Sequence, residues 1–121
     1  MLSRLYEEYV MNPIVRYERD IAFNEGTIFP TKILLSKNDT STASVRLSMI
    51  NRSEEINMHT HNESDQIEYC IKGKAIIFIE GLGEKEILEG TFIYIPKGVR
   101  HGLVNVIEPL TVLTVFIPPL F

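Results

Sequence analysis

The stretch HTHNESDQIEYCIKG, residues 59–73, decides the fold because it joins a histidine pair to an alternating apolar run. It begins with His59 and His61, two of the three histidines in the chain. Successive side chains of a β-strand point to opposite faces, so these imidazoles share a face if a strand carries both. By the same alternation, Gln66 and Glu68 share a face of the following run. A polar face of this kind suits the inside of a protein only if it lines a cavity.

Length and composition indicate a single globular domain over residues 1–121. Apolar residues make up 45% of the chain and charged residues 23%, with a formal net charge of −4. Lysines and arginines are scattered, so the charge pattern argues against a nucleic-acid partner. The single cysteine excludes an intrachain disulfide scaffold. No run resembles a signal peptide or a membrane span, so we expect a cytoplasmic protein without a membrane partner.

The chain changes character at Pro13. Residues 2–11 have apolar side chains at helical spacing, which predicts a short N-terminal helix within residues 1–13. The residue before a proline disfavours helical backbone, so this helix should end there. Short β-prone runs separated by turn residues follow, and they predict an all-β sandwich or barrel. The runs that matter below are 14–19, 56–61, 66–72, 74–80 and 111–117.

A second stretch, GTFIYIPKGVRHGLVN (90–105), carries the third histidine, His101. Together the two stretches resemble, in order and spacing, the two motifs of the cupin superfamily. The matching positions are His59, His61 and Gly73 in the first motif, and Gly90, Pro96, Gly98, His101 and Asn105 in the second. The resemblance covers residues 43–117 and is that of a small single-domain cupin. It implies a double-stranded β-helix, a jelly-roll barrel of antiparallel strands around a central cavity.

Two positions depart from the family pattern. Ser53 stands where the family has its first glycine, and Gln66 stands where it has a metal-binding glutamate. The resemblance implies that His59, His61 and His101 are metal ligands and that position 66 supplies the fourth. Imidazole nitrogens suit a divalent transition metal such as Fe, Mn, Ni, Cu or Zn. A neutral amide binds such an ion more weakly than a carboxylate and leaves its full charge in place, which should favour an anionic substrate or lower the pKa of a bound water.

Glu68 is unexpected, because the family usually has an apolar or aromatic residue at this inward position. A buried charge without compensation is costly, so the carboxyl group should be protonated, meet a cation or reach the metal. Three roles stay open. Glu68 is a general acid or base beside the metal, it replaces Gln66 as the fourth ligand, or it belongs to a structural salt bridge for which Arg46 is one partner.

The sequence predicts a metal-dependent enzyme acting on a small organic molecule. Oxygenase-type chemistry is favoured because neutral imidazoles with open positions can hold substrate and O₂ on a redox metal. Isomerase or lyase chemistry, with Glu68 as the base, comes next. The alternative is a barrel that binds or senses a small ligand without turnover. The apolar tail FIPPLF (116–121) should cover the barrel mouth or, with residues 2–19, form a homodimer interface.

Overall fold

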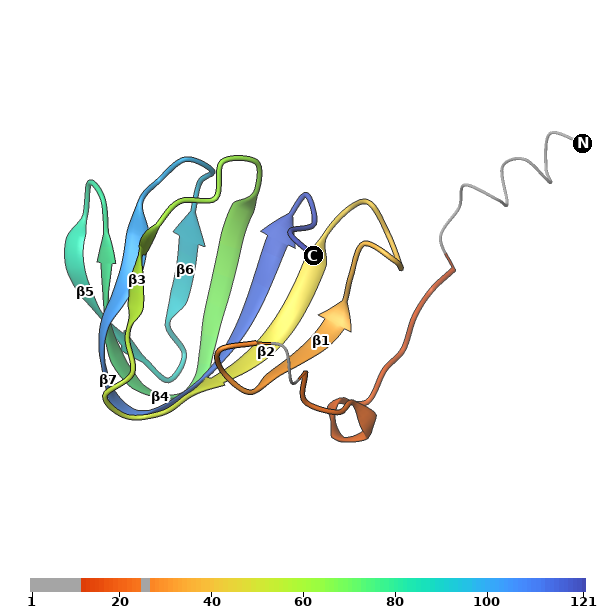
Figure 1. Cartoon of the computed structure of the whole chain (residues 1–121), viewed down its shortest axis with the longest axis horizontal. Coiled ribbons are helices and arrows are strands. Elements are labelled where there is room, and N and C mark those ends of the chain that lie inside the picture. The colour runs from red at the N-terminus through yellow and green to blue at the C-terminus, as the bar shows by residue number, and fades with distance from the viewer. Residues whose placement is uncertain (1–11, 25–26) are drawn as a thin grey trace, which may run out of the picture.

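Alternating apolar and polar residues build seven strands in the computed structural model, which describes residues 12–24 and 27–121 (Figure 1). In chain order the strands are β1 (Thr31–Leu35), β2 (Ser44–Ile50), β3 (Ile56–His59), β4 (Asp65–Ile79), β5 (Gly83–Leu88), β6 (Phe92–Ile95) and β7 (His101–Ile117). Within the described residues the single helical element is a 3₁₀ turn, η1 (Glu18–Asp20). None of the helices in this part of the chain is long and apolar enough to cross a membrane.

The two long strands, β4 and β7, pair antiparallel along their length and hold the barrel together. The first half of β4 also pairs with β6, and its second half pairs with β5. Likewise, β3 pairs with the start of β7, and β2 pairs with its end and with β1. Each long strand therefore belongs to both faces of a curled antiparallel sheet that encloses an interior (Figure 1). This architecture confirms the predicted jelly-roll barrel.

Gly73 allows β4 to bend from one face to the other. Its φ is +104°, and a Cβ at this position would collide with the carbonyl oxygen of Pro109 on β7. The register of β4 against β7 shifts around the bend. Even-numbered residues such as Gln66 and Cys70 therefore point inward before it, and odd-numbered residues such as Ile77 point inward after it. Because only glycine fits this crossing, the predicted strands 66–72 and 74–80 join into one long strand.

Part of the interior is filled by apolar side chains. Twelve buried residues form a single cluster, with Phe29, Ile56 and Val99 packed against it. The cluster comprises Ile50, Cys70, Ala75, Ile77, Ile79, Ile87, Ile93, Ile95, Leu103, Val106, Leu110 and Val112. Burial of such side chains is the main driving force for closing the barrel. It leaves the polar positions of the same strands to line the remaining space.

The predicted strand over 14–19 is wrong. This segment is extended and ends in η1, and side chains rather than a strand ladder tie it to the barrel. Lys32 of β1 donates to the backbone oxygen and the carboxylate of Glu18, both at 3.0 Å. Arg16 donates two hydrogen bonds, of 2.8 and 3.1 Å, to the Asp39 carboxylate. The predicted N-terminal helix over 2–11 lies outside the described residues.

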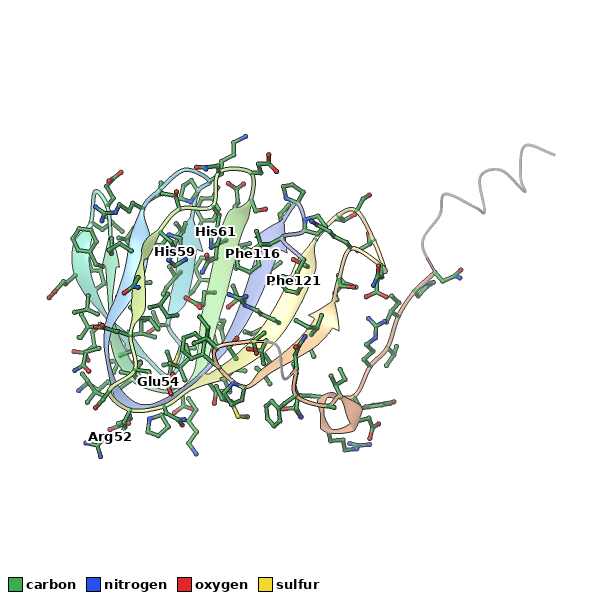
Figure 2. The ribbon with its side chains drawn as sticks, in the orientation of Figure 1. Arg52, Glu54, His59, His61, Phe116 and Phe121 are labelled. Carbon is green, nitrogen blue, oxygen red and sulfur yellow. The ribbon has the colours of Figure 1, made fainter. Side chains whose placement is uncertain are left out.

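The C-terminal tail lies on its own barrel. The amide of Leu120 donates to the Ser44 hydroxyl at 2.9 Å, and the carbonyl of Phe121 accepts from the amide of Lys37 at 2.8 Å. The Phe121 ring meets the Phe116 ring edge-on at 6.0 Å between centroids. Figure 2 shows both rings on the side of the interior where His61 lies. The homodimer, with this tail and residues 2–19 as its interface, stays a prediction.

Candidate metal centre

His59 and His101 face each other across two neighbouring strands. They are direct partners in the antiparallel register of β3 and β7. The strands approach closely here, because a Cβ on Gly102 would lie 2.7 Å from the carbonyl oxygen of Ile56. A glycine beside His101 therefore permits the approach that brings the two imidazole centroids to 4.4 Å.

His61 joins this pair from the loop after β3. The predicted strand 56–61 is too long, since β3 ends at His59. The backbone oxygen of His61 accepts from the amide of Gly98 at 2.8 Å, which fixes the loop against the second motif. The imidazole meets the Phe116 ring edge-on at 5.1 Å between centroids. The backbone hydrogen bond to Gly98 and the contact with Phe116 thus position His61, which was expected to lie on a strand.

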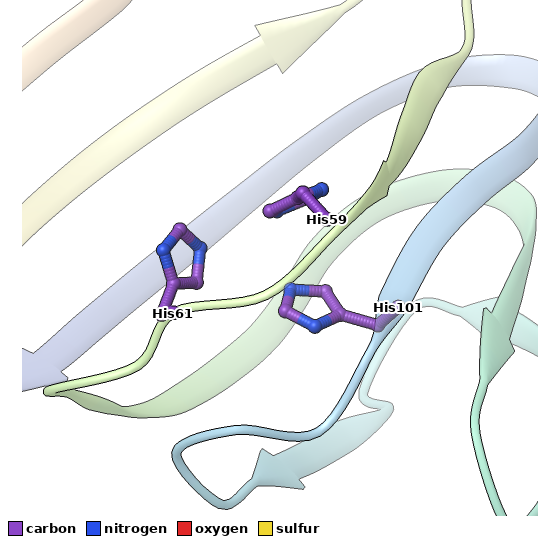
Figure 3. Close-up of side chains that lie close together, drawn as sticks. All are labelled: His59, His61 and His101. Carbon is purple, nitrogen blue, oxygen red and sulfur yellow. The ribbon is translucent and has the colours of Figure 1, made fainter.

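The three imidazoles form one cluster (Figure 3). Their ring centroids are 4.4 to 5.5 Å apart, and one nitrogen from each ring can be chosen so that all three lie within 4.8 Å of one another. Two nitrogens bound to one ion at about 2.1 Å are at most ~4.2 Å apart, so small ring rotations would bring the set onto a common ion. The predicted convergence of His59, His61 and His101 is therefore confirmed.

The tautomers leave lone pairs free for a metal. Nδ1 of His59 lies 2.7 Å from the carbonyl oxygen of Asn57, and Nδ1 of His101 lies 2.9 Å from that of Val99. A carbonyl oxygen only accepts, so both Nδ1 atoms carry the proton and both Nε2 atoms carry the lone pair. Burial, together with the neighbouring imidazoles, lowers the pKa of His61 to about 4, and burial also lowers the pKa of His101. The lowered pKa values favour neutral imidazoles at His61 and His101, as metal binding requires.

Two unpartnered atoms test whether this donor set fits a metal. The side-chain oxygen of Gln66 and Nε2 of His101 are buried and have no hydrogen-bond partner among the described residues. Orphaned buried acceptors are costly, and a cation is the partner that would satisfy both. Gln66 is the cross-strand partner of Phe116, whose ring contacts His61. The three histidines fit a transition-metal site, and Gln66 lines the same cavity with an unpartnered side-chain oxygen.

The cluster opens into a cavity of about 320 Å³, at the small end of the range for small-molecule sites. Its lining combines the metal-binding candidates, an apolar wall and a polar group. The polar group comprises Thr27, Thr31, Arg46, Ser48, Glu68 and Thr114, and the apolar wall includes Phe29, Ile50, Ile56, Ile77, Leu103 and Val112. The expected inward polar face of 66–72 thus lines a real cavity.

Glu68 lies in this cavity, outside the set of clustered histidine nitrogens. The Thr114 hydroxyl donates to its carboxylate at 3.1 Å. The side chain keeps some solvent access, yet protein atoms crowd the carboxyl group, and this burial raises its pKa. No ion pair within 4.0 Å joins Glu68 to Arg46 in the described residues, although the charge of Arg46 acts on it at longer range.

The sequence does not predict Thr114 as a site residue, and it predicts Arg46 only as a salt-bridge partner of Glu68. Both belong to one cross-strand row, because Arg46 pairs with Thr114 and Thr114 pairs with Glu68. The alternation of β7 could have placed Thr114 on the inward face, two residues from the buried Phe116. The register that brings the three together joins strands far apart in the sequence, and no local pattern encodes it.

A curled antiparallel barrel with an inward histidine cluster is the architecture of a cupin with a candidate metal site. Residues 46–116 match the family described as "Cupin domain", and the chain belongs to this family.

The chain is also similar to two curated proteins without a described function. It is 33% identical to one from Aquifex aeolicus over 94 residues, which cover 78% of this chain and 74% of that protein. It is 34% identical to one from Streptomyces coelicolor over 55 residues, which cover 46% of this chain and about half, 51%, of that protein.

Two solved structures show the same fold. The structure of KdgF from a Halomonas species has a TM-score of 0.79 and 20% identity, covering 88% of this chain and 94% of that one. Ectoine synthase from P. lautus has a TM-score of 0.78 and 21% identity, covering 89% of this chain and 80% of that one. At these identities the likeness establishes the shared barrel and no more.

Proposed function

We propose that this protein is a metal-dependent enzyme that transfers a proton to or from a small organic molecule. The observation that carries the proposal is the place of Glu68. Its carboxyl group lies in the same cavity as the histidine cluster, one inward position along β4 from Gln66. At about 3.3 Å rise per residue, the two positions are ~7 Å apart along the strand. That spacing leaves room for a small molecule between the metal ligands and a proton acceptor.

Each group has a distinct role in this proposal. His59, His61 and His101, with Gln66, would hold a divalent transition metal. A bound ion of this kind acts as a Lewis acid that polarises a carbonyl or hydroxyl oxygen. Glu68 accepts or donates the proton at carbon or oxygen, and the Thr114 hydroxyl donates a hydrogen bond to one of its carboxylate oxygens.

Proton transfer points to lyase or isomerase chemistry. The sequence pattern alone favours an oxygenase, since neutral imidazoles leave open positions on a redox metal. The cavity adds a carboxyl group beside the donor set, and this group gives proton transfer the stronger support. Ectoine synthase, which has the same fold, is an enzyme by its name, and this likeness is compatible with catalysis in the barrel. Oxygenase chemistry remains the second candidate on the grounds of the donor set.

A non-catalytic ligand-binding barrel is the alternative from a different class. The neutral amide at Gln66 supports it, since a weak fourth ligand suits reversible binding as well as turnover. In that case Glu68 would contribute to ligand affinity and not to a rate.

The test combines metal content with proton exchange. The protein is purified without chelators, its metal is measured by elemental analysis, and small hydroxy acids, keto acids and their amides are incubated with it in D₂O. We expect deuterium to enter a C–H position of at least one compound, followed by NMR. Glu68→Gln should slow this exchange by about 10²–10⁴-fold with metal content unchanged. Metal uptake without exchange or conversion of any compound, the same for both proteins, would refute the catalytic proposal in favour of the binding barrel.

A further inference from the structure

Arg46 occupies the inner face of the barrel at the level of Glu68. The register of β2, β7 and β4 places Arg46, Thr114 and Glu68 in one row across three adjacent strands. Strands are about 4.8 Å apart, so Arg46 and Glu68 flank Thr114 at a backbone separation of roughly 10 Å. The next row toward the histidines holds Gln66 and Phe116. Arg46 therefore lines the same cavity as the metal-binding candidates, two strands away from Glu68.

The guanidinium of Arg46 has no polar partner in residues 12–24 and 27–121. Its Nε is buried without a hydrogen bond, and no carboxylate lies within ion-pair distance. A buried cation left unpaired is costly, so such groups normally have a counter-charge. The side chain lines the cavity, where an incoming molecule can supply that counter-charge.

Two aromatic rings hold the guanidinium in place. Its central carbon lies 5.1 Å from the ring centroid of Phe116 and 5.7 Å from that of Phe121. In Figure 2 these two rings lie next to each other, with His61 nearby. Cation–π contacts fix a guanidinium without occupying its N–H groups. Arg46 thus packs against two rings while its Nε keeps an unused hydrogen-bond donor, an arrangement that suits recognition of a planar oxyanion.

The charge of the site favours the same kind of ligand. The four metal-binding candidates are imidazole and amide side chains, none of which carries a negative charge, so a divalent ion would keep its full charge. Arg46 adds a further positive charge, and Glu68 alone opposes it among the charged residues that line the cavity. The cavity with metal is therefore positive overall, and an anionic ligand would balance it.

We propose that Arg46 binds the carboxylate of a small organic acid and so selects acids over neutral molecules as ligands of the barrel. This inference rests on the proposed function, because it names the substrate class of the same cavity. The acid would lie with its carboxylate at Arg46 and its adjoining carbon between the histidine cluster and Glu68. The apolar wall formed by residues such as Ile50 and Val112 would enclose the remaining carbon atoms.

The experiment compares acids with their amides of equal size. Zn²⁺-loaded and metal-free protein are titrated with acetate, lactate and malonate, and with acetamide, lactamide and malonamide, by following backbone amide shifts in NMR spectra. The variants are Arg46→Gln, Arg46→Lys and, as a control, Arg52→Gln. Arg52 is exposed and lies at the far end of the barrel from His61 (Figure 2), so the control removes the same charge from a distant surface.

We expect the Zn²⁺-loaded wild type to bind an acid at least tenfold more tightly than its amide. Arg46→Gln should weaken acid binding at least tenfold and leave amide binding unchanged, while Arg52→Gln matches the wild type. Arg46→Lys keeps the positive charge but loses the planar guanidinium that can donate two parallel hydrogen bonds to a carboxylate. This variant should therefore bind acids at least about threefold more weakly than the wild type. Arg46→Lys decides the question if Arg46→Gln does not fold.

Equal binding of acids and amides by the wild type would overturn the inference, as would undiminished acid binding by a folded Arg46 variant. Failure of the proposed function has separate signatures, which are the absence of Zn²⁺ uptake or the absence of deuterium exchange by the metal-loaded protein. In that case the titrations of metal-free protein still test whether Arg46 binds a carboxylate, since this binding depends on Arg46 and not on the ion.

Discussion

Replacing Gly102 by alanine should damage the metal centre through the backbone alone. A Cβ at this position would lie 2.7 Å from the carbonyl oxygen of Ile56 and 3.1 Å from the amide nitrogen of Met58. These are backbone atoms of β3, so the strand itself must move by about 0.7 Å to reach an ordinary contact distance. Gly102 is not in the left-handed region, so the cost of the substitution is steric and not conformational.

That movement acts on stability and on metal binding together. Overpacking of this kind costs about 1–3 kcal/mol, which lowers the Tm of a chain this long by roughly 3–15 °C. His59 lies on β3 directly opposite His101, the neighbour of Gly102, and metal–ligand distances tolerate only about ±0.2 Å. We therefore expect at least a tenfold loss of Zn²⁺ affinity, measured by calorimetric titration, alongside the drop in Tm by differential scanning calorimetry.

Gly81→Ala is the matched control. Gly81 has a φ of +89°, and a methyl group added there would have no neighbour within 4 Å, so alanine strains the backbone of a hairpin without displacing another residue. Its Tm should fall, because L-residues disfavour this conformation by about 1–2 kcal/mol, while its Zn²⁺ affinity stays at the wild-type value. If Gly102→Ala binds Zn²⁺ as tightly as Gly81→Ala does, the close approach of β3 and β7 does not position the imidazoles.

The remaining predictions concern individual polar groups. His101→Ala should lower Zn²⁺ affinity by more than about a hundredfold and leave the β-sheet circular dichroism spectrum unchanged; unaltered metal stoichiometry would exclude His101 as a ligand. Gln66→Glu should tighten Zn²⁺ binding at least about tenfold, because a carboxylate replaces a neutral amide, and equal affinity would mean that residue 66 is not a ligand. Glu68→Gln should raise the Tm of the metal-free protein at pH 7, because it removes a charge that burial disfavours but keeps an acceptor for Thr114; a lower Tm would mean that the carboxylate is structural. The pKa of Asp39 is lowered by its hydrogen bond to Arg16, so this carboxylate contributes stability that is present above its unfolded pKa and is lost as pH falls through the folded one. Asp39→Asn should therefore lower the Tm at pH 7 and have no effect at pH 2, and parallel Tm curves for both proteins from pH 7 to pH 2 would contradict it.

The strands of the barrel were predictable where side chains alternate around a fixed motif. The inward positions from Gln66 to Cys70 follow strand parity, and the spacing of the two motifs places His101 opposite the histidine pair. The joining of two predicted strands at Gly73 was not predictable. A glycine there is compatible with a turn or with a bend, and the crossing of Pro109 on β7, far along the sequence, selects the bend. The run 14–19 is β-prone by composition, but in the structure it is joined to β1 by side-chain hydrogen bonds of Arg16 and Lys32 and not by a strand ladder.

The metal-binding candidates could be found from the sequence because each motif carries its histidines at fixed local spacing. The row that contains Arg46, Thr114 and Glu68 could not be found in this way. Its members come from three strands, and their alignment depends on the register of β2 against β7 and of β7 against β4. A shift of one residue in either pairing would turn one of these side chains to the outer face. Local sequence thus encodes the donors of the site, and tertiary register encodes what surrounds them.

The metal centre alone does not explain why an arginine, Arg46, lines the same cavity. The charge of Arg46 reaches the histidine cluster, where it adds to burial and to the neighbouring imidazoles in lowering the pKa of His61. The same positive charge must oppose any cation held by these histidines, so Arg46 weakens the metal site that it faces. Arg46→Gln should then leave Zn²⁺ affinity equal or higher while it weakens the binding of acids, and a fall in both would mean that Arg46 supports the structure of the site. A residue that opposes the metal and has no partner among the described residues is best explained by an anion that binds between them.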